Sequence, residues 1–137
     1  MPTTISTIEN GRAKFAYDRA KEAAELNYKE YTSYVKKMPM LIKTNGLGAT
    51  FSFYLSKIDP SQDQESKESK TYRLIGNHLT NYLKQSPIQP TEIRNCNNFN
   101  NLIEKILSCD STQYRLITQD ILAFVNWLRR FSDGLIG

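Results

Sequence analysis

The sequence predicts an all-α fold in which residues 1–137 form one compact domain, a single bundle of about six helices. Apolar residues recur every three or four positions in each long segment, and no segment alternates as a strand would. The chain has 137 residues, of which 39% are hydrophobic. This length suffices for one packed core and is too short for two ordinary domains.

The first predicted helix runs from about Thr7 to Leu26. Ser6-Thr7-Ile8-Glu9 has the S-x-x-E form of a capping box, which suits a helix start. One side of this helix is built from small residues that let a neighbouring helix approach closely, namely Ala13, Ala16, Ala20, Ala23 and Ala24. Arg12 and Arg19 lie beside this surface. They either snorkel at the edge of the core or contact a ligand or partner.

The second predicted helix runs from Tyr28 to Lys43 and contains Pro39, which favours a kink or a split into two shorter helices. Its apolar face consists of Tyr31, Tyr34, Val35, Met38, Leu41 and Ile42. Asn45-Gly46 can adopt the left-handed conformation that ends a helix. A third helix follows at once, with Leu47, Phe51, Tyr54, Leu55 and Ile58 on its buried side. Gly48 could permit a close helix contact.

A lysine stripe lies almost opposite the apolar face of the second helix. Lys29, Lys36 and Lys43 are seven residues apart, which places their charges roughly 10 Å apart along a continuous helix. The stripe is either a solvated helix surface or an edge that follows phosphates. Residues 1–58 hold nine Lys and Arg against five Asp and Glu, so the basic excess lies mainly in this half.

Residues 59–70 are polar and have mixed charge, which predicts a flexible loop between helices. The next helix carries Tyr72, Ile75, Leu79, Tyr82 and Leu83 on one face and ends before Pro87. Gly76 either weakens this helix or marks a close crossing. Residues 86–98 are expected to form a loop, with one turn after Thr91.

Two helices complete the chain. Phe99, Leu102, Ile103, Ile106 and Leu107 define a short helix that ends near Cys109, and Asp110-Ser111-Thr112 supplies caps for the next. The core stripe of the last helix is Tyr114, Ile117, Ile121, Phe124, Val125, Leu128 and Phe131. Leu116, Ala123 and Trp127 lie off this stripe. They bury against the N-terminal segment or form an interface with a partner.

The residues that common enzyme classes require are missing from the sequence. His78 is the one histidine, Cys96 and Cys109 have no C-x-x-C spacing, and no phosphate-binding loop or nucleophile elbow occurs. We therefore predict no catalytic residues, no metal site and no cofactor. The sequence has no run of eighteen apolar residues, its N-terminal stretch MPTTISTIENGRAKF lacks the apolar core of a signal peptide, and it has only two cysteines. We therefore expect a cytoplasmic protein without a membrane partner.

One stretch resembles a known family. Arg12-Ala13, Phe15-Ala16-Tyr17, Tyr31 to Ile42, Asn45-Gly46-Leu47-Gly48 and Phe51-x-Phe53 are similar to the small subunit of the type III-B (Cmr) CRISPR effector complex. The specific part is P-x-L-I-x-x-N-G-L-G, and the match covers roughly residues 10–58. The resemblance implies a helical, non-catalytic subunit that stacks with copies of itself in an inner filament. It also implies contacts with guide RNA, target RNA, and the backbone and large subunits.

The charge pattern supplies the candidate RNA contacts. Lysine and arginine side chains on helix faces bind phosphates without reading sequence. We expect Lys29, Lys36, Lys37 and Lys43 to contact RNA, followed by Arg12, Lys14 and Arg19. Two alternatives stay open: a free-standing helical protein–protein adaptor that does not bind RNA, and a metal-independent ribonuclease.

Overall fold

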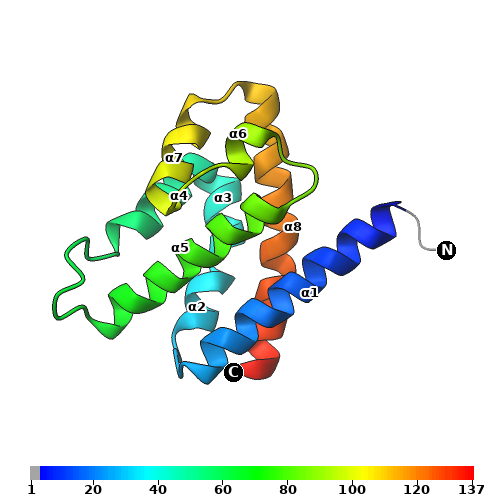
Figure 1. Ribbon diagram of the computed structural model, residues 1–137. Coiled ribbons are helices and arrows are strands. Elements are labelled where there is room, and N and C mark those ends of the chain that lie inside the picture. The colour runs from blue at the N-terminus through cyan, green and yellow to red at the C-terminus, as the bar shows by residue number, and fades with distance from the viewer. Residues whose placement is uncertain (1–3) are drawn as a thin grey trace.

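The long helices α1 (Thr4–Glu25) and α8 (Ser111–Leu135) pack against each other, and three of the helices between them in the sequence also pack on α8 (Figure 1). This computed structural model describes residues 4–137, and no strand occurs in that part of the chain. The other helices are α2 (Tyr31–Lys36), α3 (Met38–Asn45), α4 (Leu47–Ser56), α5 (Lys67–Gln85), α6 (Thr91–Arg94) and α7 (Phe99–Ser108). The predicted all-α fold is confirmed.

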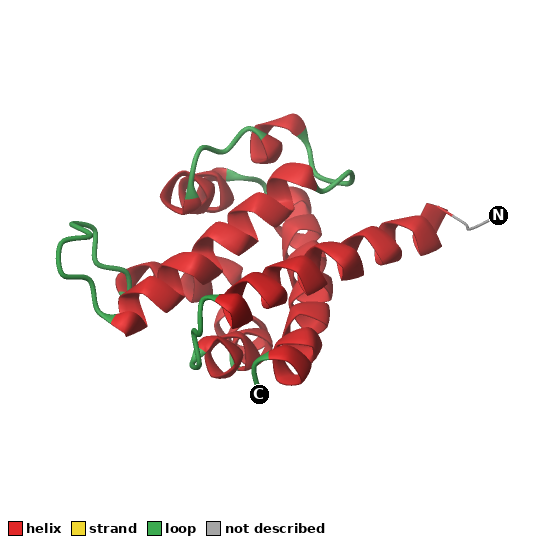
Figure 2. Ribbon diagram, turned by 60° about the horizontal axis from the view of Figure 1, so that its bottom comes forward, coloured by secondary structure: helices red, strands yellow, loops and turns green. Residues whose placement is uncertain are grey.

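The alanine surface of α1 does what the sequence predicted. Ala16, Ala20 and Ala23 are fully buried, and α1 packs chiefly on α8. The first turns of α1 extend beyond the rest of the bundle in two different views (Figures 1 and 2). The predicted capping box is wrong, because α1 begins at Thr4, before Ser6, and the Glu9 carboxylate accepts hydrogen bonds from Arg12 and Trp127 instead.

Pro39 splits the predicted second helix. α2 ends at Lys36, and α3 begins at Met38 with the proline in its first turn, where a missing N–H costs nothing. The predicted start at Tyr28 is three residues early, since Asn27 takes a left-handed conformation with φ 60° and α2 begins at Tyr31. Gly46 has φ 91° and separates α3 from α4 as expected.

The polar segment is shorter than predicted. α5 begins at Lys67 and not at Tyr72, because Ser66 caps it by accepting a hydrogen bond from the Ser69 amide. Arg73 bonds to Glu65 and to the Asp59 carbonyl, so these polar residues find partners within the loop and the first turns of α5. The flexibility of the loop stays a prediction.

The buried core follows the apolar stripes of the sequence. Only partly buried among the stripe residues are Tyr34, Leu41, Leu55, Ile58, Tyr114 and Phe131. Buried as predicted are Tyr31, Val35, Met38, Ile42, Leu47, Phe51, Tyr54, Tyr72, Ile75, Leu79, Tyr82, Leu83, Leu102, Ile103, Ile106, Ile117, Ile121, Phe124, Val125 and Leu128. Leu107 follows the helical spacing of the apolar residues in α7 but is 65% exposed. It lies at the edge of an open groove of about 650 Å³ between α7 and α8.

Two glycines mark close helix crossings. A methyl group on Gly76 of α5 would lie 2.8 Å from Phe99 of α7, and one on Gly48 of α4 would lie 2.9 Å from Leu107. The structure thus supports the interpretation of Gly76 as a crossing point. These contacts hold α7 against α4 and α5. Among the described residues, no helix is long and apolar enough to cross a membrane.

Candidate nucleic-acid interface

The lysine stripe is not continuous. Lys29 lies in the turn before α2, Lys36 is the last residue of α2, and Lys43 belongs to α3. Because Pro39 breaks the helix, the regular spacing assumed from a single helix does not apply. The three residues still lie within one short segment, residues 29–43, and all three are exposed.

The three lysines differ in their partners. Lys36 forms a 2.8 Å ion pair with Asp133 of α8, and both side chains are 49% exposed. Such surface pairs contribute at most about 1 kcal/mol, so a phosphate can displace the carboxylate. Within residues 4–137, Lys29 and Lys43 have no side-chain hydrogen bond or ion pair. Lys29 also lines a shallow hollow with Asn27, Glu30 and Lys67.

Lys37 has a different environment, because aromatic rings surround it. Its ammonium donates a 2.7 Å hydrogen bond to the Tyr72 hydroxyl. The nitrogen also lies 5.0–5.8 Å from the ring centres of Tyr34, Phe53, Tyr54 and Tyr72. Burial lowers the pKa of Lys37, and the carboxylate of Glu68 opposes this change. The side chain is half-buried, so part of it stays accessible.

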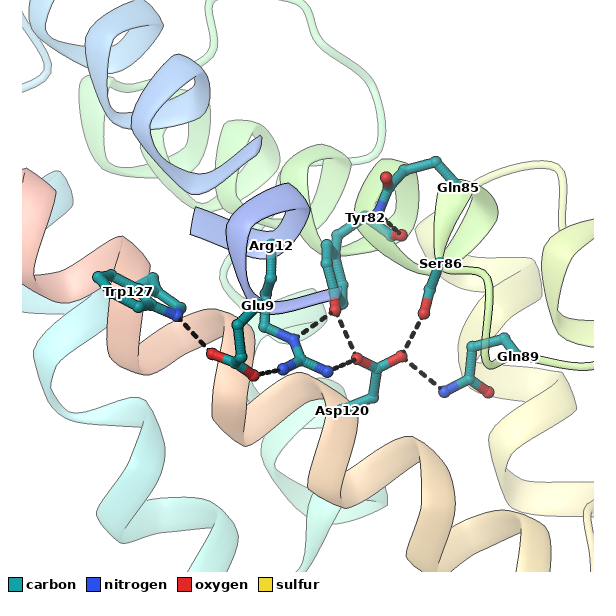
Figure 3. Close-up of polar contacts among 8 residues, drawn as sticks. All are labelled: Glu9, Arg12, Tyr82, Gln85, Ser86, Gln89, Asp120 and Trp127. Atoms are coloured by element: carbon teal, nitrogen blue, oxygen red, sulfur yellow. Dashed lines mark hydrogen bonds and ion pairs between the residues drawn. The ribbon is translucent and has the colours of Figure 1, made fainter. Parts of the chain in front are cut away.

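Arg12 is buried and joins α1 to α5 and α8 (Figure 3). Its side chain is only 8% exposed, and Nη2 lies 3.0 Å from the Asp120 carboxylate. Nε donates to the Tyr82 hydroxyl at 2.8 Å, and Nη1 pairs with Glu9. A guanidinium held on three sides and removed from water has little capacity for a phosphate.

Asp120 is the acceptor at the centre of this network. One carboxylate oxygen accepts from Arg12 and Tyr82. The other accepts from Ser86 at 2.6 Å and from the Gln89 amide at 2.9 Å, and the carboxylate itself is fully buried (Figure 3). A buried charge of this kind requires a complete set of partners. The network therefore fastens the loop after α5 to α8 and has a structural role.

The two remaining cations of α1 are more accessible. Lys14 forms a 3.0 Å pair with Asp18 one turn later, and its side chain is 72% exposed. The guanidinium of Arg19 lies 4.7 Å from the Phe15 ring centre, a cation–π distance. Its Nε is buried and has no acceptor among residues 4–137. Lys14 is thus well placed for an external anion, whereas Arg19 is only partly exposed.

Trp127 buries against the N-terminal helix. Its indole N–H donates a 3.0 Å hydrogen bond to Glu9 (Figure 3). Its ring stacks on Phe131, with the ring centres 5.8 Å apart. Trp127 and Leu116 both retain partial exposure on α8. The structure therefore shows the contact with the N-terminal segment, and it leaves part of both side chains available to a partner.

The single histidine is held in the core. Its Nε2 lies 2.7 Å from Glu22 and its Nδ1 2.6 Å from the Tyr31 hydroxyl. Burial lowers the pKa of His78 to about 4, and the neighbouring Glu22 opposes this shift. A neutral ring with hydrogen on Nε2 satisfies both partners, since Tyr31 donates to Nδ1. His78 is therefore committed to packing and is not poised for proton transfer at neutral pH.

The thiols are also poor nucleophiles. Burial raises the pKa of both Cys96 and Cys109, so both stay protonated at neutral pH. In the part of the chain that the structure describes, no three His, Cys, Asp or Glu side chains group as metal ligands. The described surface offers cations and aromatic rings, which suit binding to anions and bases.

Several important residues were missed in the sequence. Asp120 lies three residues after Ile117 and four before Phe124, so its place on the buried face could have been noticed from the spacing. Lys57 lies 5.4 Å from the ring centre of Phe53, and the spacing of four residues at the end of α4 could have indicated this contact. Lys67 lies 5.3 Å from the ring centre of Tyr28, and no pattern in the sequence indicates this contact, because it joins two separate segments of the chain.

Comparisons with known proteins give a consistent result. Residues 8–135 match the family described as CRISPR-associated protein (Cas_Cmr5). The chain is 25% identical over 125 residues to the "CRISPR system Cmr subunit Cmr5" of Thermus thermophilus, and this alignment covers 90% of this chain and 91% of that protein. Its fold is similar to the crystal structure of a CRISPR-associated Cmr5 family protein from the same organism. The TM-score is 0.72 at 23% identity, and the match covers both chains fully.

Proposed function

Because the chain belongs to the Cmr5 family of CRISPR-associated proteins, we propose that it is the non-catalytic small subunit of a type III-B RNA-guided, RNA-targeting complex. In this role its copies stack in an inner filament and contact guide and target RNA through the phosphate backbone. Base pairing between guide and target supplies the sequence specificity. The match over residues 8–135, nearly the whole chain, is the observation that carries the proposal.

The accessible cations support the RNA contact. Lys29, Lys36 and Lys43 are exposed and have either no partner within residues 4–137 or a weak one. They form the primary proposed RNA-binding set, and Lys37, Lys14 and Arg19 extend it. Arg12 is not included in this set, because its guanidinium is enclosed by Glu9, Tyr82 and Asp120 and has a structural role. Many weak phosphate contacts repeated along a filament would add through multivalency.

The exposed apolar side chains of the surface are the proposed contacts with other subunits. Trp127 and Leu116 keep part of their side chains accessible on α8. Leu107 is 65% exposed beside the groove between α7 and α8. Such positions suit neighbouring copies of the chain or the backbone and large subunits of the complex.

A labelled single-stranded RNA separates this proposal from its two rivals. The RNA is incubated with the purified chain in chelator, and binding and cleavage are followed as salt increases. A small subunit would bind the RNA without cleaving it, and its affinity would fall as the salt concentration rises. A ribonuclease would shorten the RNA without any other subunit, and an adaptor would leave it unbound even after assembly with its partners.

A further inference from the structure

Two lysines and three aromatic residues from separate helices meet at one edge of the bundle. We call Tyr34, Lys37, Phe53, Lys57 and Tyr72 the aromatic–lysine site. Tyr34 belongs to α2, Lys37 joins α2 to α3, Phe53 and Lys57 lie on and just after α4, and Tyr72 lies on α5. The Tyr34 and Tyr72 rings stack with their centres 4.2 Å apart and their planes 11° apart.

Phe53 is the open part of this site. Its side chain is 41% exposed, whereas Phe51 and Tyr54 beside it in α4 are fully buried and fill the core. The ammonium nitrogens of Lys37 and Lys57 lie 5.2 and 5.4 Å from the centre of the Phe53 ring. An exposed ring with two cations at cation–π distance presents an aromatic surface and positive charge at the same place.

Lys37 is held in position for such a role. The hydrogen bond to the Tyr72 hydroxyl and the rings on several sides fix its ammonium, so little side-chain entropy is lost when an anion binds. An ammonium has three N–H groups, and the bond to Tyr72 uses one of them. The remaining donors lie on a half-buried side chain next to the exposed ring.

We propose that the aromatic–lysine site binds an unpaired nucleotide of single-stranded RNA. The base stacks on Phe53, and Lys37 and Lys57 contact the adjoining phosphates. This inference rests on the proposed RNA-binding function and assigns it a second kind of site. The lysines Lys29, Lys36 and Lys43 follow the backbone, whereas this site holds a base. Stacking of a base on an aromatic side chain tolerates any base, because every base has a π-face.

The charges around the site predict the direction in which a substitution of Glu68 changes the affinity for RNA. Lys37 and Lys57 are the cations, and the carboxylates of Glu68 and Glu30 act on Tyr34 from α5 and from the turn before α2. Glu68 also acts on Lys37 and Tyr72. A phosphate entering the site is attracted by the lysines and repelled by Glu68. Glu68→Gln should therefore increase affinity, a gain that loss of folding cannot imitate.

The experiment uses the full chain and a short single-stranded RNA that contains one 2-aminopurine, whose fluorescence is quenched on stacking. We expect the wild type to quench the fluorophore, and Phe53→Ala to lose the quenching and about tenfold in affinity. Phe53→Tyr keeps the ring and should behave as the wild type. Leu135→Ala removes an apolar side chain of similar exposure, 39% against 41% for Phe53, from the end of α8 and is the matched control. Circular dichroism confirms that each variant is folded.

Two results would overturn the site. If Phe53→Ala binds and quenches as the wild type does, the base does not stack there, although backbone binding and the proposed function stand. If the wild type neither binds nor quenches at about 1 mM protein, which exceeds the usual range for non-specific binding, the site is absent from the free chain. The role as a subunit is then tested separately by assembly. A lower affinity in Glu68→Gln would contradict the assigned charges.

Discussion

Arg12 and Asp120 are 108 residues apart in the sequence and form a 3.0 Å ion pair inside the bundle. Their neighbours Tyr82, Ser86 and Gln89 bond to the same carboxylate. A cation that looked like an RNA contact in the sequence is thus part of the structure that holds α1 and α5 on α8. Removing either partner would leave an uncompensated buried charge.

Asp120→Ala should therefore destabilise the fold by about 3–5 kcal/mol. Urea denaturation followed by circular dichroism measures this loss as a lower unfolding free energy. The matched control is Asp133→Ala, which breaks the exposed pair with Lys36 and should cost less than about 1 kcal/mol. Similar losses of unfolding free energy in the two variants would show that the buried network stabilises the fold no more than the exposed pair does.

Gly76 and Gly11 should respond oppositely to the same substitution. Gly11→Ala in α1 meets open space and should stabilise the protein by about 0.5–1 kcal/mol, since alanine favours a helix. Gly76→Ala places a methyl group 2.8 Å from Phe99 and should destabilise it by about 1–3 kcal/mol despite the same gain in propensity. Thermal unfolding of both variants tests this. A stabilised Gly76→Ala would mean that α5 and α7 do not cross closely.

His78 should make stability depend on pH below neutrality. Burial lowers its pKa from 6.5 to about 4 in the folded protein, so the unfolded chain binds the proton more tightly. The contribution of the neutral His78 ring to the free energy of unfolding is complete above pH 6.5 and is lost as the pH falls from there towards 4. Between pH 6.5 and 5 the loss should be about 1–2 kcal/mol.

The imidazole NMR signal of this single histidine gives the pKa directly, and urea denaturation at several pH values gives the stability. His78→Gln should remove most of the dependence between pH 6.5 and 5, while carboxylates still titrate at lower pH. A histidine that titrates near 6.5 in the folded protein would contradict the buried neutral ring.

The three exposed lysines should account for the salt-dependent part of RNA binding. Replacing Lys29, Lys36 and Lys43 together by Glu should weaken binding to single-stranded RNA and reduce the slope of log K against log salt by about 2. The control carries the same charge change at three exposed cations elsewhere, Lys21→Glu, Lys84→Glu and Arg115→Glu. Equal losses in both triple variants would show that only net charge matters and would remove this face from the proposal.

The fold was largely predictable from local patterns. Helical spacing identified the buried faces, and Pro39, Asn45-Gly46 and Asp110 marked boundaries that the structure confirms. The errors occur where tertiary contacts decide. Leu107 has the correct spacing for the core but faces an open groove, and Glu9 bonds to Arg12 and Trp127 in place of a helix cap.

The candidate site was less predictable, because charge alone does not reveal burial. Arg12 and Lys29 are both cations in the basic half of the sequence, yet one is enclosed and the other exposed. The difference depends on Asp120 and Tyr82, which approach Arg12 only in the folded chain. For the same reason the sequence did not indicate that Lys37 approaches Phe53, beside Lys57.

Co-purification tests the central claim most directly. The tagged chain is expressed in its native host, isolated at low salt, and analysed for bound protein and RNA. As a small subunit it should carry along larger CRISPR subunits and a guide RNA of defined length, in more than one copy per complex. Recovery of the chain alone, without RNA and without those subunits, would contradict the account.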